Sequence, residues 1–89
     1  GLSALTRCMA LELAKYNINV NIISPGMIRV ENAERFYDDP ANQSMFNNIP
    51  LGKVGMPTDI VGTAVLLASD ESDYITGTTI VIDGGFSYV

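Results

Sequence analysis

Residues 18–28 read Ile-Asn-Val-Asn-Ile-Ile-Ser-Pro-Gly-Met-Ile, and this stretch decides the fold. Apolar and polar side chains alternate before two isoleucines, a pattern that predicts a short strand over Ile18–Ile23. Pro25 has no amide hydrogen for a strand ladder and Gly26 tolerates unusual backbone angles, so we expect the chain to leave the sheet there. Ligands of open α/β sheets bind beyond the carboxyl ends of strands, which makes Ser24–Ile28 a candidate site.

The segment before this strand predicts a helix over Leu2–Tyr16. Its apolar residues recur at helical spacing along one stripe, which consists of Leu2, Leu5, Met9 and Leu13. The opposite side carries small and apolar residues beside Arg7 and Lys15. We therefore expect the helix to bury one face in the core and a second face against a partner.

A polar stretch and two further elements are expected after the strand. Val30–Asn48 is the most polar part of the chain and predicts short helical pieces broken at Pro40, in the position of a lid. Pro57 is typical of a first helical turn, and apolar side chains at helical spacing continue to Ser69. Thr78–Ile82 predicts a second strand, which a Gly-Gly turn ends.

The order of elements predicts an α/β fold. Two strands joined through helices lie parallel, and a parallel sheet needs more strands and covered faces than 89 residues provide. The chain is also 47% hydrophobic, which is high for so short a domain. We therefore expect residues 1–89 to be the C-terminal segment of a single doubly wound parallel-sheet domain whose N-terminal half is absent.

Charge and composition exclude several classes of function. Ten acidic and five basic residues give a net charge of −5, and the basic residues form no stripe that would follow a nucleic acid. No apolar run approaches the roughly 20 residues that cross a bilayer, so we expect no membrane partner. One cysteine and no histidine exclude a disulfide scaffold and a Cys/His zinc cluster, and we expect no metal site. These features favour a cytoplasmic protein, and the initial glycine suggests a cut start.

Side chains with catalytic potential are few. Tyr37 lies in the polar stretch and is interpreted as a surface aromatic, with contact to a substrate as the alternative. The adjacent carboxylates Asp38-Asp39 are expected to be solvated, and Cys8 is expected in the helix core rather than as a nucleophile. The backbone of Met27 and Ile28 is suited to hydrogen-bond a planar amide group, with an ordinary strand-to-loop turn as the alternative.

Five motifs together resemble one family. Asn21–Ile28 resembles the nicotinamide-side loop of short-chain dehydrogenases/reductases, and Pro50–Ile60 resembles their connector into the penultimate helix. Leu66–Asp70, Tyr74–Gly77 and Ile80–Gly85 are similar to the segments that follow in that family. The resemblance covers nearly the whole chain in the family's order, and the chain is identified by it as the C-terminal portion of a member.

The resemblance implies a one-domain Rossmann fold that transfers hydride between NAD or NADP and an alcohol or carbonyl. It implies contacts with the nicotinamide from Pro25, Gly26, Met27, Ile28 and Val30, with the Ile28 backbone on the carboxamide. Val30 stands where the family often has threonine, so one hydroxyl contact is missing.

The family's catalytic Ser and its Tyr-x-x-x-Lys motif would precede Gly1, so we expect no catalytic residue within the 89 residues and no activity from them alone. Lys53 replaces the arginine usual in the connector and could pair with Asp59.

The resemblance also implies partners. The family's substrates are small alcohols or carbonyls, and Val30–Asn48 resembles its variable substrate lid. A homo-oligomer, tetramer or dimer, is expected through the Leu2–Tyr16 helix and the C-terminal strand region. The alternative is a non-catalytic interaction or oligomerisation module derived from the same fold.

Overall fold

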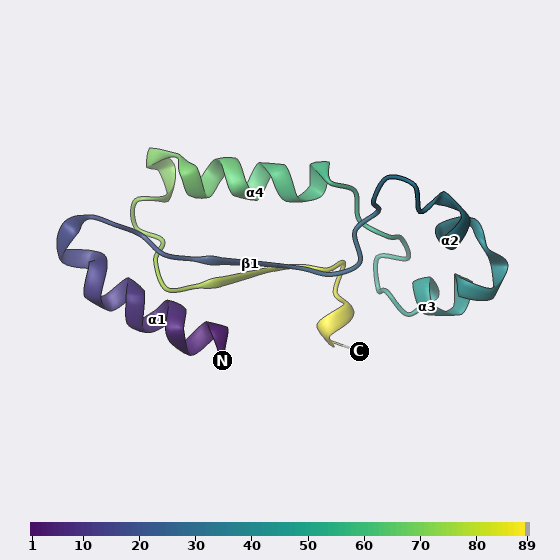
Figure 1. The fold of residues 1–89 in the computed structure, drawn as a ribbon, viewed down its shortest axis with the longest axis horizontal. Coiled ribbons are helices and arrows are strands. Elements are labelled where there is room, and N and C mark those ends of the chain that lie inside the picture. Colours follow the sequence, from purple (N-terminus) through teal and green to yellow (C-terminus); the bar gives the residue numbers. More distant parts are fainter. Residues whose placement is uncertain (89) are drawn as a thin grey trace. The chain divides into compact units, whose positions relative to one another are not determined.

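The computed structural model describes residues 1–88 (Figure 1). The chain divides into two compact units. The first comprises Gly1–Ser24 and Gly62–Val81, and the second comprises Pro25–Val61 and the described residues from Ile82 onward.

In the first unit, α1 (Leu2–Leu13) and the 3-10 helix Ala14–Tyr16 confirm the predicted first helix. The residues that α1 buries are Thr6 and Ala10, whereas Leu2, Leu5 and Met9 of the predicted core stripe are exposed. A Cβ added to Gly77 would lie 3.5 Å from the Ala10 Cβ, so the helix packs through small residues. The prediction of the buried face was therefore wrong.

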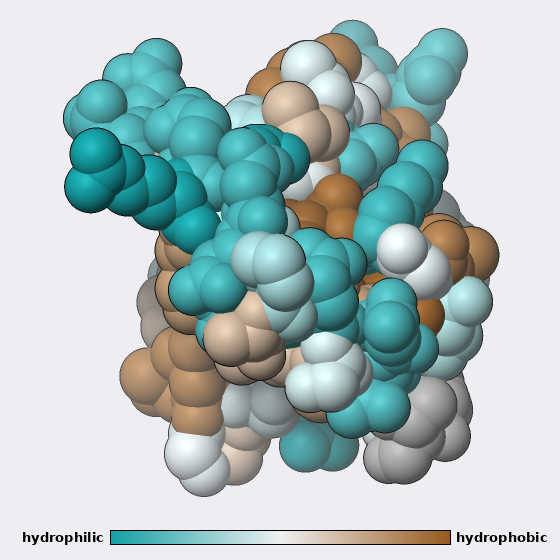
Figure 2. Space-filling model, turned by 90° about the vertical axis from the view of Figure 1, so that its right-hand side faces the viewer, coloured by the Kyte–Doolittle hydropathy of each residue, from teal (hydrophilic) through white to brown (hydrophobic). Residues whose placement is uncertain are grey.

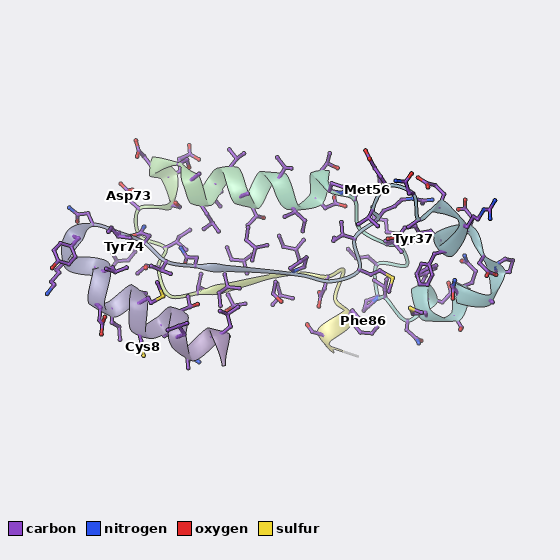
Figure 3. The ribbon with its side chains drawn as sticks, in the orientation of Figure 1. Cys8, Tyr37, Met56, Asp73, Tyr74 and Phe86 are labelled. Atoms are coloured by element: carbon purple, nitrogen blue, oxygen red, sulfur yellow. The ribbon has the colours of Figure 1, made fainter. Side chains whose placement is uncertain are left out.

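Cys8 likewise lies outside the core of this unit. It sits within α1 as expected, but its thiol is free and exposed. Figure 3 shows the side chain pointing away from the strands. The interpretation of Cys8 as a core residue was wrong, because the helix packs on the sheet through the face that carries Thr6 and Ala10.

The first strand, β1 (Ile22–Pro25), begins four residues later than predicted, and asparagine side chains supply several of the hydrogen bonds upstream of it. Asn19 Nδ2 donates to the carbonyl oxygens of Ser72 and Asp73 at 3.1 and 3.2 Å. Asn21 donates to the Ile75 carbonyl at 2.9 Å and accepts from the Thr78 amide at 3.1 Å. These side-chain amides hold the stretch together with a backbone bond, from the Gly77 amide to the Val20 carbonyl at 2.7 Å.

The strand β2 (Thr79–Ile82) pairs with β1 in a parallel sheet. The Ile22 amide donates to the Thr78 carbonyl and the Gly26 amide to the Ile82 carbonyl, each at 2.9 Å, so both strands advance in the same direction. Within residues 1–88, β1 pairs with β2 alone, which leaves its other edge without a partner strand.

The helix α4 (Thr58–Ala68) confirms the predicted second helix and is followed by a 3-10 helix over Asp70–Ser72. In the first unit, α1 and the C-terminal part of α4 lie on opposite sides of the strands (Figure 1). This is the layering of an α/β fold. None of the helices in residues 1–88 combines the length and hydrophobicity that crossing a bilayer requires.

In the second unit, the polar stretch forms α2 (Glu34–Asp38), a 3-10 helix over Pro40–Asn42 and α3 (Gln43–Asn47). The break at Pro40 confirms the predicted helical pieces. Asp39 caps the 3-10 helix that follows this break, because its carboxylate accepts the Ala41 amide at 2.9 Å. In the view of Figure 2, hydrophilic residues predominate and hydrophobic ones lie among them.

The start of α4 follows the sequence prediction, but one expected ion pair is absent. Asp59 Oδ2 accepts the Met56 amide at 2.7 Å, with Pro57 and Thr58 between them, so the carboxylate satisfies an amide just before the helix. Lys53 and Asp59 do not form an ion pair in the part of the chain that the structure describes. The expectation of that pair was wrong, and the recorded partner of the Asp59 carboxylate is the Met56 amide.

Candidate functional site

The carboxyl end of β1 brings Gly26 against the end of β2. A Cβ on Gly26 would lie 2.6 Å from the Asp83 Cβ and 2.8 Å from the Asp83 Cα, closer than such atoms pack. Gly26 does not have a positive φ. The glycine is therefore required by the close approach of two backbones and not by the unusual angles that the sequence suggested.

Beyond Gly26 the loop lies beside the connector before α4. The Gly55 amide donates to the Met27 carbonyl at 2.9 Å, and the Arg29 amide donates to the Gly55 carbonyl at 2.7 Å. These bonds form an isolated parallel bridge between Ile28 and Gly55. The connector thus fixes the peptide units on both sides of Ile28, a contact that sequence reasoning did not predict.

Tyr37 holds the same loop from the side of α2. Its hydroxyl donates to the Ile28 carbonyl at 3.0 Å and accepts the Val30 amide at 3.2 Å. The side chain is only 9% exposed, so its interpretation as a surface aromatic was wrong. Phe36, Tyr37 and Phe46 are three aromatic residues in the most polar stretch of the chain, and that clustering was a signal of a small local core.

Of the five residues predicted to contact a cofactor, Pro25 ends β1 and the other four lie in the loop that follows, but their backbone groups differ in availability. The Gly26 amide is used in the strand ladder and the Val30 amide on Tyr37. The amides of Met27 and Ile28 have no acceptor among the described residues. Pro25 has no amide hydrogen to offer. The loop therefore presents two backbone donors.

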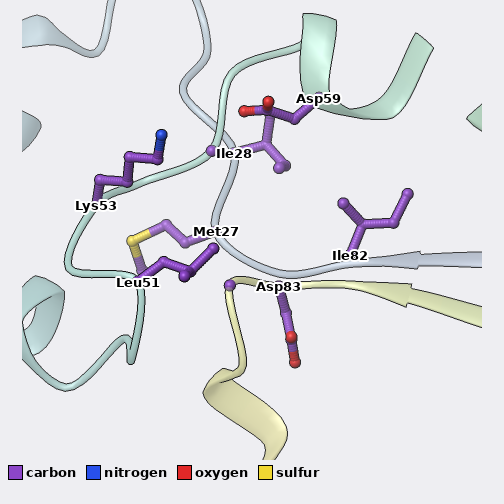
Figure 4. A pocket seen from close by; sticks show the side chains of 9 residues that line it. Met27, Ile28, Leu51, Lys53, Asp59, Ile82 and Asp83 are labelled. Carbon is purple, nitrogen blue, oxygen red and sulfur yellow. The ribbon is translucent and has the colours of Figure 1, made fainter. Parts of the chain in front are cut away.

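A cavity of about 190 Å³ adjoins these two residues (Figure 4). In Figure 4 the apolar side chains of Met27 and Leu51 lie close together, and the Asp59 carboxylate lies farther along the wall. The lining consists of Met27, Ile28, Leu51, Lys53, Gly55, Asp59, Ile82, Asp83 and Gly84. A mostly apolar cavity with a few polar groups is the usual form of a small-molecule site.

A second hollow of about 350 Å³ shares Met27 with the first. Its other lining residues are Gly26, Met45, Ile49, Asp83 and Phe86. Ile49 is 5% exposed, and Phe86, labelled in Figure 3, belongs to the 3-10 helix that follows β2. Met27 thus adjoins both the cavity and the more apolar hollow.

Asp83, which lines both spaces, serves the turn after β2. Its carboxylate accepts the amides of Gly85 and Ser87, each at 2.9 Å. The hydrogen bond from the Ser87 amide lowers the pKa of Asp83 below its usual value, against a smaller opposing effect of desolvation. Gly84 and Gly85 have φ of 64° and 91°, which confirms the predicted tight turn. The carboxylate is thereby committed to structure.

The adjacent acidic residues at the end of α2, Asp38 and the following Asp39, also have structural partners. Asp38 lies 3.4 Å from the Arg29 guanidinium, and Asp39 accepts the Ala41 amide. Asp59 likewise accepts a backbone amide, that of Met56, so each of the three carboxylates has a local partner. The two backbone donors of the loop suit a planar amide-bearing group.

Comparison with known proteins gives close matches along the chain. The sequence model of a family described as enoyl-(acyl carrier protein) reductase matches residues 1–87. The 2-dehydro-3-deoxy-D-gluconate 5-dehydrogenase of Escherichia coli K12 is 44% identical over 87 residues, which are 97% of this chain and 34% of that protein. The 3β-hydroxysteroid dehydrogenase 1 of Eggerthella lenta is 44% identical over 88 residues, 98% of this chain and 34% of its own.

Solved structures match equally well. A 4-hydroxyisoleucine dehydrogenase complexed with NADH has a TM-score of 0.89 at 45% identity, covering 99% of this chain and 37% of that one. A protein of Agrobacterium tumefaciens with bound NADP has a TM-score of 0.87 at 40% identity, covering 100% of this chain and 37% of that one. The chain spans about a third of the length of the curated relatives it matches. It belongs to the short-chain dehydrogenase/reductase family.

Proposed function

We propose that the chain is the C-terminal part of an NAD(P)-dependent oxidoreductase that interconverts an alcohol and a carbonyl by hydride transfer. Residues 1–89 then supply the nicotinamide-side loop, the substrate lid and a subunit interface, while the N-terminal half of the Rossmann domain precedes Gly1. Family membership and the NADH and NADP bound by two structural neighbours support this cofactor class. The protein with whatever residues precede Gly1 in its own gene is called the source protein below.

The observation that carries the proposal is a pair of amides in the loop after β1 that have no acceptor among the described residues. They belong to Met27 and Ile28, and both residues line a cavity whose wall includes the apolar side chain of Leu51. A carboxamide oxygen needs such donors, and a planar ring packs on apolar side chains, so the residues fit a nicotinamide. The nicotinamide, when bound, supplies the hydride donor or acceptor.

The chain's own residues hold the amide end of the cofactor in this proposal. The Ile28 amide donates to the carboxamide oxygen. The Ile28 carbonyl accepts Tyr37 with one lone pair and has a second for the carboxamide NH₂. Pro25 and Gly26 fix the exit from β1, and Val30 offers an exposed isopropyl group in place of the family's hydroxyl.

The catalytic Ser, Tyr and Lys of the family are proposed to lie before Gly1. The tyrosine would act as the general acid and base, with its pKa lowered by the lysine and the cofactor. The 89 residues alone are then inactive. Within the cavity described above, the Asp59 carboxylate accepts the Met56 amide and so helps to hold the start of α4.

We further propose a cytoplasmic homo-oligomer, dimer or tetramer, that assembles through the Leu2–Tyr16 helix and the C-terminal strand region. Leu2, Leu5 and Leu11 are 66%, 56% and 81% exposed on α1, and Val81 of β2 is 47% exposed. Apolar side chains in this number favour contact with a partner. Size-exclusion chromatography with light scattering of the source protein tests the assembly, and a monomer would contradict it.

The test of the function uses the source protein with NADH, NADPH and a panel of small alcohols and carbonyls. Binding is followed by the fluorescence of the reduced nicotinamide, and turnover by its absorbance. We expect binding of at least one cofactor and turnover of part of the panel. A folded source protein that binds neither cofactor would refute the proposal, and turnover by the 89-residue chain would refute its inactivity.

The second candidate is a non-catalytic interaction module of the same fold. The exposed apolar side chains of α1 favour it, because they suit helix-to-helix contact without any chemistry. Intact mass and N-terminal sequencing of the source protein separate the two candidates. A Tyr-x-x-x-Lys motif before Gly1 means the enzyme, and a native start near Gly1 means the module.

A further inference from the structure

Tyr37 connects the lid to the loop that adjoins the cavity. Its hydroxyl bonds to two backbone groups, the Ile28 carbonyl and the Val30 amide, at 3.0 and 3.2 Å. These groups belong to successive peptide units, so one side chain fixes the orientation of both. The hydroxyl uses its only hydrogen and one of its lone pairs in doing so.

The ring of Tyr37 is itself held on several sides. Phe36 and Phe46 lie with ring centroids 5.5 and 6.0 Å from that of Tyr37. The Arg29 guanidinium lies 4.9 Å from the ring centroid and pairs with Asp38 of α2 at 3.4 Å. The aromatic contacts with Phe36 of α2 and Phe46 of α3 pack the ring within the lid. The contact with Arg29 links the ring to the loop.

The connector completes the restraint on Ile28. The peptide unit between Ile28 and Arg29 is held at both ends. Its Ile28 carbonyl accepts the Tyr37 hydroxyl, and its Arg29 amide donates to the Gly55 carbonyl. The preceding unit has the Gly55 amide at the Met27 oxygen. Because the two ends of a trans peptide point in opposite directions, the Ile28 amide is turned away from Gly55. The loop is thus restrained from the connector and from the lid.

We propose that Tyr37 is a positioning residue through which the folded lid sets the Ile28–Val30 loop for the nicotinamide carboxamide, an inference that rests on the proposed function. Tyr37 touches neither cofactor nor substrate in this role. Because the lid holds the loop through its hydroxyl, ordering of the lid and binding of the cofactor favour each other. Such coupling is reciprocal, so the cofactor also stabilises the lid.

The experiment compares Tyr37→Phe with the unaltered source protein. The substitution keeps the buried ring and removes the two hydrogen bonds. We expect the Kd and KM of NAD(P)H to rise about tenfold, the effect of roughly one hydrogen bond. We expect kcat to change little, because the loop holds the cofactor equally before and during the reaction.

Tyr74→Phe is the matched control. Tyr74 is 103% exposed, and its hydroxyl forms no hydrogen bond with the described residues, so the same chemical change should leave Kd and kcat as they are. Equal Kd values for unaltered protein and Tyr37→Phe would overturn the inference. A cofactor Kd that rises equally in both variants would do so as well.

Hydrogen exchange at the Val30 amide gives a readout that does not depend on activity. Without cofactor, the amide should exchange faster in Tyr37→Phe than in unaltered protein, because its acceptor is lost. Unchanged exchange overturns the role of Tyr37. If Tyr37→Phe does not fold, NAD(P)H added to unaltered protein must slow exchange across α2 and α3, and no slowing overturns the coupling. An unaltered, folded source protein that binds no cofactor instead refutes the proposed function.

Discussion

Replacing Gly26 by alanine is the sharpest test of the arrangement at the end of β1. The new Cβ would start 2.6 Å from the Asp83 Cβ, so the backbones must separate by about 0.8 Å to reach ordinary contact at 3.4 Å. Overpacking of this kind costs about 1–3 kcal/mol. Separation also weakens the bond from the Gly26 amide to the Ile82 carbonyl, which costs about 1 kcal/mol more.

The assay is urea unfolding of the source protein, with Gly62→Ala as the matched control. We expect Gly26→Ala to lower the free energy of unfolding by about 3 kcal/mol, which moves the urea midpoint by about 1 M. Gly62 lies within α4 and has no atom within 4 Å of an added Cβ. Alanine there should raise the free energy of unfolding by about 0.5–1 kcal/mol.

The same added methyl group should therefore lower the free energy of unfolding at Gly26 and raise it at Gly62. The cofactor Kd should rise in Gly26→Ala, because the displaced strand end moves the Met27 and Ile28 amides. Gly62→Ala should leave the Kd unchanged. A Gly26→Ala protein as stable as the unaltered one would refute the close-approach reasoning.

Three further substitutions test the site. Asp83→Asn should lower the free energy of unfolding of the source protein at neutral pH. This loss of stability should be complete above the usual aspartate pKa of 3.8 and should vanish as the pH falls through the lower pKa of Asp83 in the folded state. Urea unfolding across this pH range checks the prediction, and a loss of stability that does not change with pH would contradict it. Val30→Thr restores the hydroxyl common in the family at a side chain 58% exposed, so NAD(P)H titration should give a Kd several-fold lower, and an unchanged Kd would count against the contact. Asp59→Ala should cost about 1 kcal/mol in urea unfolding by freeing the Met56 amide, and an unchanged midpoint would show that the cap is dispensable.

The elements of the fold were largely predictable because they follow local patterns. Helical spacing gave α1 and α4, and the Gly-Gly pair gave the turn after β2. The start of β1 was not predictable, since the Asn19 and Asn21 side chains hydrogen-bond to carbonyls more than 50 residues away along the chain. Side-chain partners at that distance leave no trace in a local pattern.

The candidate site was predictable in its position but not in its supports. Pro25 and Gly26 marked the loop, whereas the bridge to Gly55 and the hydrogen bonds of Tyr37 depend on how distant segments meet. The buried face of α1 was missed for a related reason. Leu5 and similar residues are the most hydrophobic, but the helix packs where Ala10 and Gly77 allow close approach.

Within residues 1–88 one edge of β1 has no partner strand, and this matters to anyone who handles residues 1–89 by themselves. A bare strand edge exposes a row of backbone donors and acceptors, which recruits any extended chain that comes near. The edge that would receive the neighbouring strand of a larger sheet is thus also a nucleus for aggregation when that strand is missing. Co-expression with a complementary fragment, rather than a stronger solubility tag, addresses the cause.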